Sequence, residues 1–365
     1  MKIAMLGTKG IPATWGGIEL HVEQLAIRYA EMGHDVTVYC RPYYTTTDEK
    51  FYKGIRLKKL PSLKSKNLDA ISHTFIATLH ALFEDYDIVH YHAIGPATMS
   101  FLPRFFGKKT VVTVHGLDWE REKWGRGAKT YLKFGERAAV MFPHATIAVS
   151  KYLKGFLEEK YNRPVNYIPS AVLDPVELPP NEIKSFGLQG GDYYLFVARL
   201  VPEKGAHYPL DAFKNLRTDK KLVIAGGSSH SDDYVKSIEE MAGDRVIFTG
   251  YVYGDTLREL YTNAYCYVHP STMEGMPITL LEAIAFGKCV VASDIPPCLE
   301  AIKDAGIVFE NKNVEDLTRA LREAENDPTM AAELGRKARA MGVEEYSYDS
   351  IAAKTVELYS SLMEK

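Results

Sequence analysis

The chain has 365 residues, 46% hydrophobic and 25% charged, a composition typical of a soluble globular protein with about two domains. Its four cysteines show no CxxC spacing, and no apolar run is long enough for a signal peptide or a membrane helix, which argues against a disulfide framework and favours a cytoplasmic protein. The net charge of −3 hides an asymmetry, because residues 1–172 carry 24 Lys and Arg against 16 Asp and Glu, whereas residues 173–365 carry 20 against 31. The basic first half either meets an anionic partner or attracts the acidic second half.

Strands and helices alternate along the first half of the chain. KIAMLG predicts a strand, a Gly-rich loop follows, and the helical pattern of residues 17–32 ends at Gly33. Further strands are predicted at HDVTVYC, Asp87–His92, Thr110–Gly116 and Ala145–Ser150, with a helix around residues 129–141. DPVELPPNE, rich in proline and acids, predicts a linker near residue 173.

The alternation restarts after this linker. A strand is predicted at Tyr193–Leu200 and a helix from about residue 206, and then come four short apolar strands, KLVIAGG, RVIFTG, CYVHPS and CVVAS. Such alternation is typical of a parallel sheet covered on both faces. We therefore predict an α/β protein with two Rossmann-like domains that face each other, residues 1–172 and 173–345, and an amphipathic helix at 346–365. Ligands are expected beyond the carboxyl ends of the strands.

Two glutamates draw attention in STMEGMPITLLEAIAFGKCVVASD, residues 271–294. Glu274 falls in the loop after the strand CYVHPS, and Glu282 falls one turn inside the next helix. Between them lies a helix N-terminus, a site that favours anions, formed by the amides of Gly275, Met276, Ile278 and Thr279. Carboxylates on both sides of an anion site suit a nucleotide-sugar, which has hydroxyls at both ends and phosphate in the middle. Alternatively, Glu282 only stabilises the helix N-terminus and Glu274 is a turn residue.

Three more loops follow predicted strands. In ARLVPEKG, Arg199 and Lys204 could neutralise a diphosphate leaving group or simply be surface cations. In GTKGIPATWGG, Gly16 and Gly17 permit close backbone approach at a helix start or form a plain turn, and the GxGxxG of dinucleotide-binding proteins is absent. VHGLDWEREKWG begins with His115, in a position that is as often structural as functional.

Together these segments resemble the retaining glycosyltransferases of family 4, which have the GT-B fold. The resemblance covers nearly the whole chain and rests on the Gly-rich first loop, ARLVPEKG, and EGMPITLLE followed by AIAFGKCVVASD. GTKGIPATWGG and HGLDWEREKW are most similar to the bacterial branch that builds surface polysaccharides, including rhamnosyltransferase-like members. The resemblance implies a cleft between the domains, an acceptor on the first, a donor on the second, and a last helix that crosses back to pack on the first.

The resemblance also implies residue roles. Glu274 would hold hydroxyls of the donor sugar, Glu282 the ribose hydroxyls, and Lys204 the diphosphate. The implied catalytic residues are Glu274, His115, Arg199 and Lys204. The implied donor contacts are Gly16, Gly17, Arg199, Lys204, Tyr251, Val252, Glu274, Gly275, Met276, Pro277, Ile278 and Glu282, and the acceptor contacts are Trp15, Asp118 and Trp119.

These roles predict transfer of a sugar from a nucleoside-diphosphate sugar to a hydroxyl of a glycan or of a polyprenyl-diphosphate-linked acceptor. A UDP-sugar is the favoured donor, and a dTDP- or GDP-sugar is the alternative. The family implies retention by attack from the leaving-group face, without a carboxylate nucleophile. No DxD-like motif stands out, so neither a metal nor another cofactor is expected. The alternatives are a nucleotide-sugar epimerase of the same fold, a non-catalytic nucleotide-sugar-binding protein and a nicotinamide oxidoreductase. The absence of GxGxxG argues against the oxidoreductase.

The stretch Lys53–Asn67 contains six cations and no acid: Lys53, Arg56, Lys58, Lys59, Lys64 and Lys66. With leucines among them, the cations could lie on an anionic membrane surface, at the inner face of the plasma membrane, or the stretch is a solvated loop. Nucleic acid is not expected as a partner, because the positive excess is modest and no binding motif is present.

Overall fold

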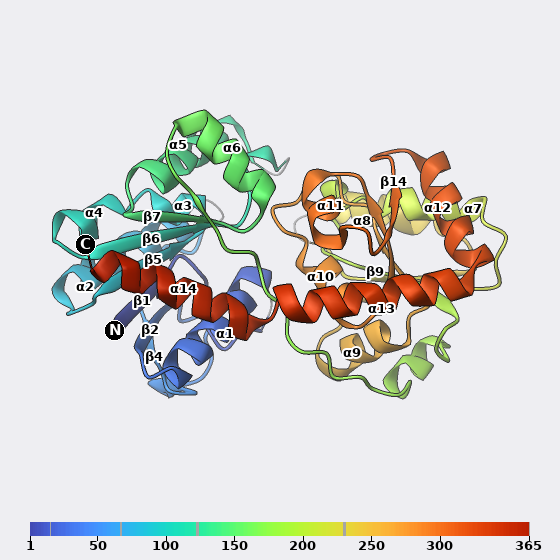
Figure 1. Cartoon of the computed structure of the whole chain (residues 1–365), viewed down its shortest axis with the longest axis horizontal. Coiled ribbons are helices and arrows are strands. Elements are labelled where there is room, and N and C mark those ends of the chain that lie inside the picture. Colours follow the sequence, from blue (N-terminus) through green and yellow to red (C-terminus); the bar gives the residue numbers. More distant parts are fainter. Residues whose placement is uncertain (15, 66–67, 122–123, 229–230, 365) are drawn as a thin grey trace. The chain divides into compact units, whose positions relative to one another are not determined.

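The computed structural model describes the chain except residues 15, 66–67, 122–123, 229–230 and 365, and it divides into two compact units (Figure 1). The first unit is Met1–Ala171 together with Tyr348–Lys365, and the second is Val172–Ser347. Each unit contains one sheet with helices packed on it, which confirms the predicted α/β class with two Rossmann-like domains. The described residues include no helix with both the length and the apolar character needed to cross a membrane.

The first unit holds an eight-stranded sheet in the order β3-β4-β2-β1-β5-β6-β7-β8. Its pairings are parallel except for the antiparallel pair β3 and β4. The central strands are buried along their lengths, which explains their continuous apolar runs. The strands are β1 (Lys2–Leu6), β2 (Asp35–Cys40), β3 (Phe51–Tyr52), β4 (Ile55–Lys59), β5 (Ile88–His92), β6 (Lys109–Val114), β7 (Ala145–Ala148) and β8 (Asn166–Tyr167).

Helices connect these strands. They are α1 (Gly17–Glu31), α2 (Asp69–Phe83), α3 (Ile94–Ala97), α4 (Phe101–Phe105), α5 (Arg126–Met141) and α6 (Lys151–Tyr161), with a 3-10 turn at Asp118–Glu120. The Ser150 side chain caps α6 by accepting from the Leu153 amide at 3.2 Å, and Asn162 ends the helix in the left-handed conformation.

The last helix, α14 (Tyr348–Met363), belongs to the first unit and packs against α1, which confirms the predicted return of the chain (Figure 1). Its Tyr359 is fully buried, and the hydroxyl lies 2.6 Å from Nδ1 of His90 on β5. Nε2 of His90 lies 2.7 Å from the hydroxyl of Thr113 on β6. Burial lowers the pKa of His90 to about 3, so a neutral ring joins α14 to the middle of the sheet.

The second unit holds a fully parallel sheet in the order β11-β10-β9-β12-β13-β14. Its strands are β9 (Tyr193–Val197), β10 (Lys221–Ala225), β11 (Val246–Gly250), β12 (Cys266–His269), β13 (Cys289–Ser293) and β14 (Ile307–Phe309). Its helices are α7 (His207–Lys214), α8 (Asp232–Glu240), α9 (Gly254–Asn263), α10 (Ile278–Ala285), α11 (Pro296–Ile302), α12 (Val314–Asn326) and α13 (Pro328–Glu345), with 3-10 turns at Glu182–Phe186 and Pro202–Lys204. α7 packs against α12 and α10 against α13.

Part of the basic stretch Lys53–Asn67 is a strand in the structure. Residues 55–59 form strand β4 rather than a solvated loop, and Ile55 and Leu57 are buried in the core. Leu57 therefore has no apolar surface to offer a membrane, whereas Leu63, after the strand, is 61% exposed. Lys66 lies outside the described residues.

We expect Tyr359→Phe to lower the melting temperature, because the change leaves a buried nitrogen of His90 without its partner. The loss should be about 1–3 kcal/mol, or several degrees. Differential scanning calorimetry measures it, with Tyr152→Phe on the exposed face of α6 as the control. Equal melting temperatures of the two variants would contradict a structural role for this bond.

Candidate functional site

In the second unit, two loops meet at the carboxyl ends of the neighbouring strands β9 and β12. The loop after β9 turns at Gly205, where φ is 72° and an added Cβ would lie 2.4 Å from the carbonyl oxygen of Pro270 in the loop after β12. The Thr272 amide donates to the Glu203 carbonyl at 2.9 Å. Only glycine permits both this backbone conformation and this close approach.

The close approach brings Lys204 and Glu274 together. Nζ of Lys204 lies 2.5 Å from Oε1 of Glu274, and the two side chains are 19% and 8% exposed. Nε2 of His269, the last residue of β12, lies 3.1 Å from the same oxygen. The predicted residues Lys204 and Glu274 thus touch each other, and His269 is a partner that the sequence reasoning missed.

The Glu274 carboxylate stays ionised although it is nearly buried. Burial alone would raise its pKa, but the charge of Lys204 and the hydrogen bond from His269 outweigh burial and hold the pKa well below its usual range. Burial lowers the pKa of His269, although the hydrogen bond to Glu274 and its charge act in the opposite direction. The pair therefore presents a fixed carboxylate and a fixed cation at the carboxyl edge of the sheet.

The pKa of the second predicted glutamate, Glu282, is shifted in the opposite direction. Glu282 lies in α10, where Oε2 accepts a hydrogen bond of 2.9 Å from the hydroxyl of Tyr261. Burial raises its pKa to about 7, and the bond from Tyr261 only partly opposes that rise. α10 begins after Pro277 without a side-chain cap, so the amides of Ile278 and Thr279 remain suited to an anion. Gly275 and Met276 lie in the loop directly before this start, with Met276 buried.

The remaining predicted donor residues of this unit lie on loops at the same edge of the sheet. The hydroxyl of Tyr251 is within 2.9 Å of the Gly227 carbonyl and 2.8 Å of the Ser228 carbonyl, which joins the loops after β11 and β10. Arg199, after β9, is half-buried and near enough to Tyr251 to oppose the rise that burial causes in the tyrosine pKa. Val252 follows Tyr251 and is half-buried.

His115 lies in the first unit, directly after β6. Its Nε2 is 3.2 Å from Nδ1 of His92, at the end of β5, and the two rings stack 5.5 Å apart. His21 of α1 meets His115 edge-on at 5.5 Å. Burial, with a smaller contribution from His90, lowers the pKa of His115 to about 3. The ring is therefore neutral at pH 7 and can share hydrogen bonds but supplies no positive charge.

Gly16 and Gly17 lie where α1 begins. Gly16 has φ 107°, a backbone conformation that favours glycine, and an added Cβ would also displace the carboxylate of Glu19, which lies 2.1 Å from its place. Glu19 is 8% exposed and accepts a hydrogen bond of 3.2 Å from the Lys9 amide. An anion at this helix start would share the site with the negative charge of Glu19.

Two of the predicted acceptor residues, Asp118 and Trp119, have side-chain partners within the first unit. The indole nitrogen of Trp119 donates to the fully buried Glu136 at 2.6 Å, and the Lys133 ammonium lies 4.9 Å from the Trp119 ring centre. Asp118 forms an ion pair of 3.1 Å with Arg121. Trp15 lies outside the described residues. The sequence left Trp119 open between a sugar-stacking surface and a core residue, and it gave no indication of the bond to Glu136.

Among residues 1–14, 16–65, 68–121, 124–228 and 231–364, no group of three or more His, Cys, Asp or Glu side chains is placed to hold a metal ion. Reaction without metal stays a prediction.

Comparison with known proteins gives two family matches. Residues 15–172 match Glycosyltransferase Family 4, and residues 180–341 match Glycosyl transferases group 1.

Individual proteins agree with these matches. An uncharacterized glycosyltransferase of Methanocaldococcus jannaschii is 29% identical over 100% of this chain and 99% of its own. O-antigen chain mannosyltransferase C of Escherichia coli is 25% identical over 97% of this chain and 96% of its own. The crystal structure of HepE from Anabaena in complex with UDP-glucose superposes with a TM-score of 0.80 at 19% identity, covering 99% of this chain and 100% of that one. This last likeness confirms the fold.

We expect Lys204→Met to destabilise the second unit by about 3–5 kcal/mol, because it leaves the Glu274 carboxylate almost buried without its cation. Adding Glu274→Gln should recover much of the loss. The measurement is the free energy of unfolding in urea for both single variants and the double variant. Lys214→Met, which breaks the exposed ion pair with Asp211, is the control and should change little. Strictly additive losses would show that Lys204 and Glu274 do not interact.

Glu282→Gln should stabilise the protein at pH 8 but not at pH 5. The pKa of Glu282 is about 7 in the folded state and near its usual value in the unfolded state, so the folded protein binds the extra proton between the two values. The contribution to stability is complete below the unfolded pKa and is lost as the pH rises through 7. Melting temperatures of wild type and variant at both pH values check this. A constant difference across the range would contradict the raised pKa.

Proposed function

Because the chain belongs to the glycosyltransferases, with a family 4 domain before a group 1 domain, we propose that it moves a sugar from a nucleoside-diphosphate sugar to an acceptor hydroxyl. A UDP-sugar is the first choice of donor, supported by the UDP-glucose complex of HepE. The acceptor is a glycan or a lipid-linked glycan in polysaccharide synthesis, supported by the O-antigen mannosyltransferase among the relatives. The observation that carries the proposal is the Lys204–Glu274 pair beside the start of α10.

In the proposed complex, the diphosphate lies against the start of α10. Lys204 and Arg199 bind its oxygens, and the Tyr251 and Val252 loop contacts the base. The ribose hydroxyls donate hydrogen bonds to the carboxylate of Glu282. Because burial favours the protonated form of Glu282, binding of the nucleoside releases the proton from this side chain.

Glu274 faces the donor sugar in this arrangement. It accepts hydrogen bonds from sugar hydroxyls and so fixes the ring. When Lys204 turns to the diphosphate, His269 still donates to Glu274 and keeps the carboxylate oriented. We therefore assign His269 as a positioning residue. A part for His115 of the first unit, a neutral ring beside His92, stays a prediction.

The proposed reaction retains the configuration at the anomeric carbon. The bond from that carbon to the diphosphate oxygen breaks, and the electron pair leaves with the diphosphate, whose growing charge Lys204, Arg199 and the start of α10 stabilise. The acceptor hydroxyl attacks from the same face, and its proton passes to a phosphate oxygen.

Glu274→Gln should lower kcat for sugar transfer by about 10²–10³-fold, the usual effect of removing one group aimed at the reacting centre, while UDP binding changes little. Product analysis by mass spectrometry with UDP-sugars, and calorimetry with UDP, separate the two effects. Assays with and without EDTA test the expected lack of a metal. Glu240→Gln, at the exposed end of α8, is the control.

Turnover of Glu274→Gln equal to wild type would remove Glu274 from the site. Release of UDP with a changed free sugar and no acceptor product would identify an epimerase. UDP binding without any turnover would identify a nucleotide-sugar-binding protein.

A further inference from the structure

The outward face of α2 is apolar. Phe75, Leu79 and Phe83 follow one another at intervals of four residues and are 44%, 37% and 90% exposed, while the opposite face of the helix is buried. Residues 70–83 contain no Lys, Arg, Asp or Glu. A helix on the surface of a protein surrounded only by water normally carries charges on its outer face.

The apolar surface continues onto α4, which packs against α2. Phe101, Phe105 and Phe106 are 36%, 85% and 65% exposed. The Lys108 ammonium, after α4, donates to the carbonyl of Glu84, after α2, and so joins the ends of the two helices. Phe75, Leu79, Phe83, Phe101, Phe105 and Phe106 are called the α2–α4 surface below. Large exposed apolar side chains gathered on two helices that pack together are typical of a site of interaction.

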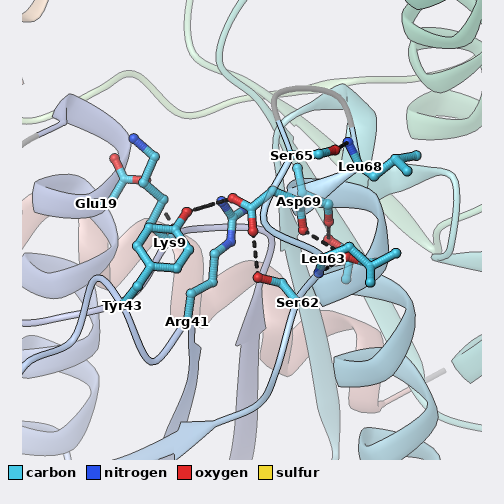
Figure 2. Close-up of polar contacts among 12 residues, drawn as sticks. Lys9, Glu19, Arg41, Tyr43, Ser62, Leu63, Ser65, Leu68 and Asp69 are labelled. Atoms are coloured by element: carbon cyan, nitrogen blue, oxygen red, sulfur yellow. Dashed lines mark hydrogen bonds and ion pairs between the residues drawn. The ribbon is translucent and has the colours of Figure 1, made fainter.

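The loop before α2 is firmly attached to the helix, as Figure 2 shows. Asp69, the first residue of α2, accepts hydrogen bonds from Arg41 and Tyr43 at 2.6 Å and from Ser62 at 2.5 Å. The Leu63 amide donates to the Ser72 hydroxyl at 2.9 Å. These bonds hold the loop in a conformation that leaves the side chain of Leu63 exposed beside α2.

Cations are frequent in the sequence before α2 and around α4, and burial together with the nearby charge of Lys58 lowers the pKa of His80 on α2. Residues 53–66 contain six cations and no acid, and residues 99–109 contain Arg104, Lys108 and Lys109 and no acid. Acids beside these segments have cationic partners: Asp69 pairs with Arg41 at 2.6 Å and Asp85 with Lys2 at 2.7 Å. Asp48 lies 3.9 Å from Lys59, and Glu84 follows α2. Phenylalanine and leucine surrounded by Lys and Arg match a bilayer with anionic headgroups, where apolar side chains enter the acyl boundary and cations remain among the headgroups.

We propose that the α2–α4 surface binds the surface of an anionic lipid bilayer. The proposal stands on unit 1 alone and does not require the sugar-transfer site of unit 2. It also moves the membrane contact suggested by the sequence, from the leucines of the basic stretch to α2 and α4. The cations of that stretch remain as electrostatic partners.

The test is cosedimentation with vesicles of phosphatidylcholine alone or mixed with phosphatidylglycerol. Wild type should bind the mixed vesicles, and added salt should weaken the binding. The triple variant Phe75→Ser, Leu79→Ser, Phe83→Ser should bind at least tenfold more weakly. The control variant Leu299→Ser, Val343→Ser removes two exposed apolar side chains of the second unit and should bind as wild type does.

Wild type that fails to bind, or a triple variant that binds equally well, would overturn the proposal. A wild-type dimer in light scattering that the triple variant converts to a monomer, without vesicle binding, would assign the surface to a second copy of the chain and also overturn it. UDP binding by the triple variant should match wild type, so loss of vesicle binding and failure of the donor site are distinguishable.

Discussion

A single carboxylate oxygen, Oε1 of Glu274, organises the candidate site, because it receives both the Lys204 ammonium and the His269 ring. An ionised carboxylate almost removed from water is stable only with such partners. Meeting that requirement draws the loop after β9 onto the loop after β12, and Gly205 is the residue that permits the contact. A cation and an anion that already balance each other can be separated by a ligand carrying both a diphosphate and hydroxyl groups.

The two glutamates of the segment 271–294 differ in their affinity for protons although they are eight residues apart. Glu274 has a cation at 2.5 Å and remains charged, whereas Glu282 accepts a hydrogen bond from the neutral hydroxyl of Tyr261 and gains a proton near neutrality. Burial acts on both in the same direction, so the partners decide the outcome. In the proposed donor complex, Glu274 is therefore ionised before the ligand binds, whereas Glu282 is ionised only in part near pH 7.

The sequence predicted what local patterns encode. Alternating strands and helices indicated both sheets, Glu274 and Lys204 drew notice as charged residues in loops after predicted strands, and the family resemblance implied the return of α14 to the first unit. Partners brought together by the fold were not predictable in this way: His269 meets Glu274 across a strand end, and Trp119 meets Glu136 from another helix. The strand at 55–59 was not predicted, because its many cations suggested a surface segment, although Ile55 and Leu57, which are buried in the core, alternate with Arg56 and Lys58 in the period of a strand.

The direction of α2 connects its apolar face with the chemistry expected of the first unit. A helix joining parallel strands runs back from their carboxyl ends to their amino ends, so α2 begins at the edge where His115 and the start of α1 lie. Arg41, directly after β2, anchors that beginning through Asp69 (Figure 2). A bilayer along α2 would therefore extend to the edge of the sheet at which an acceptor is expected. A lipid-linked acceptor could then reach that edge while its lipid stays in the membrane, so the exposed phenylalanines and the loops at the strand ends would serve the same substrate.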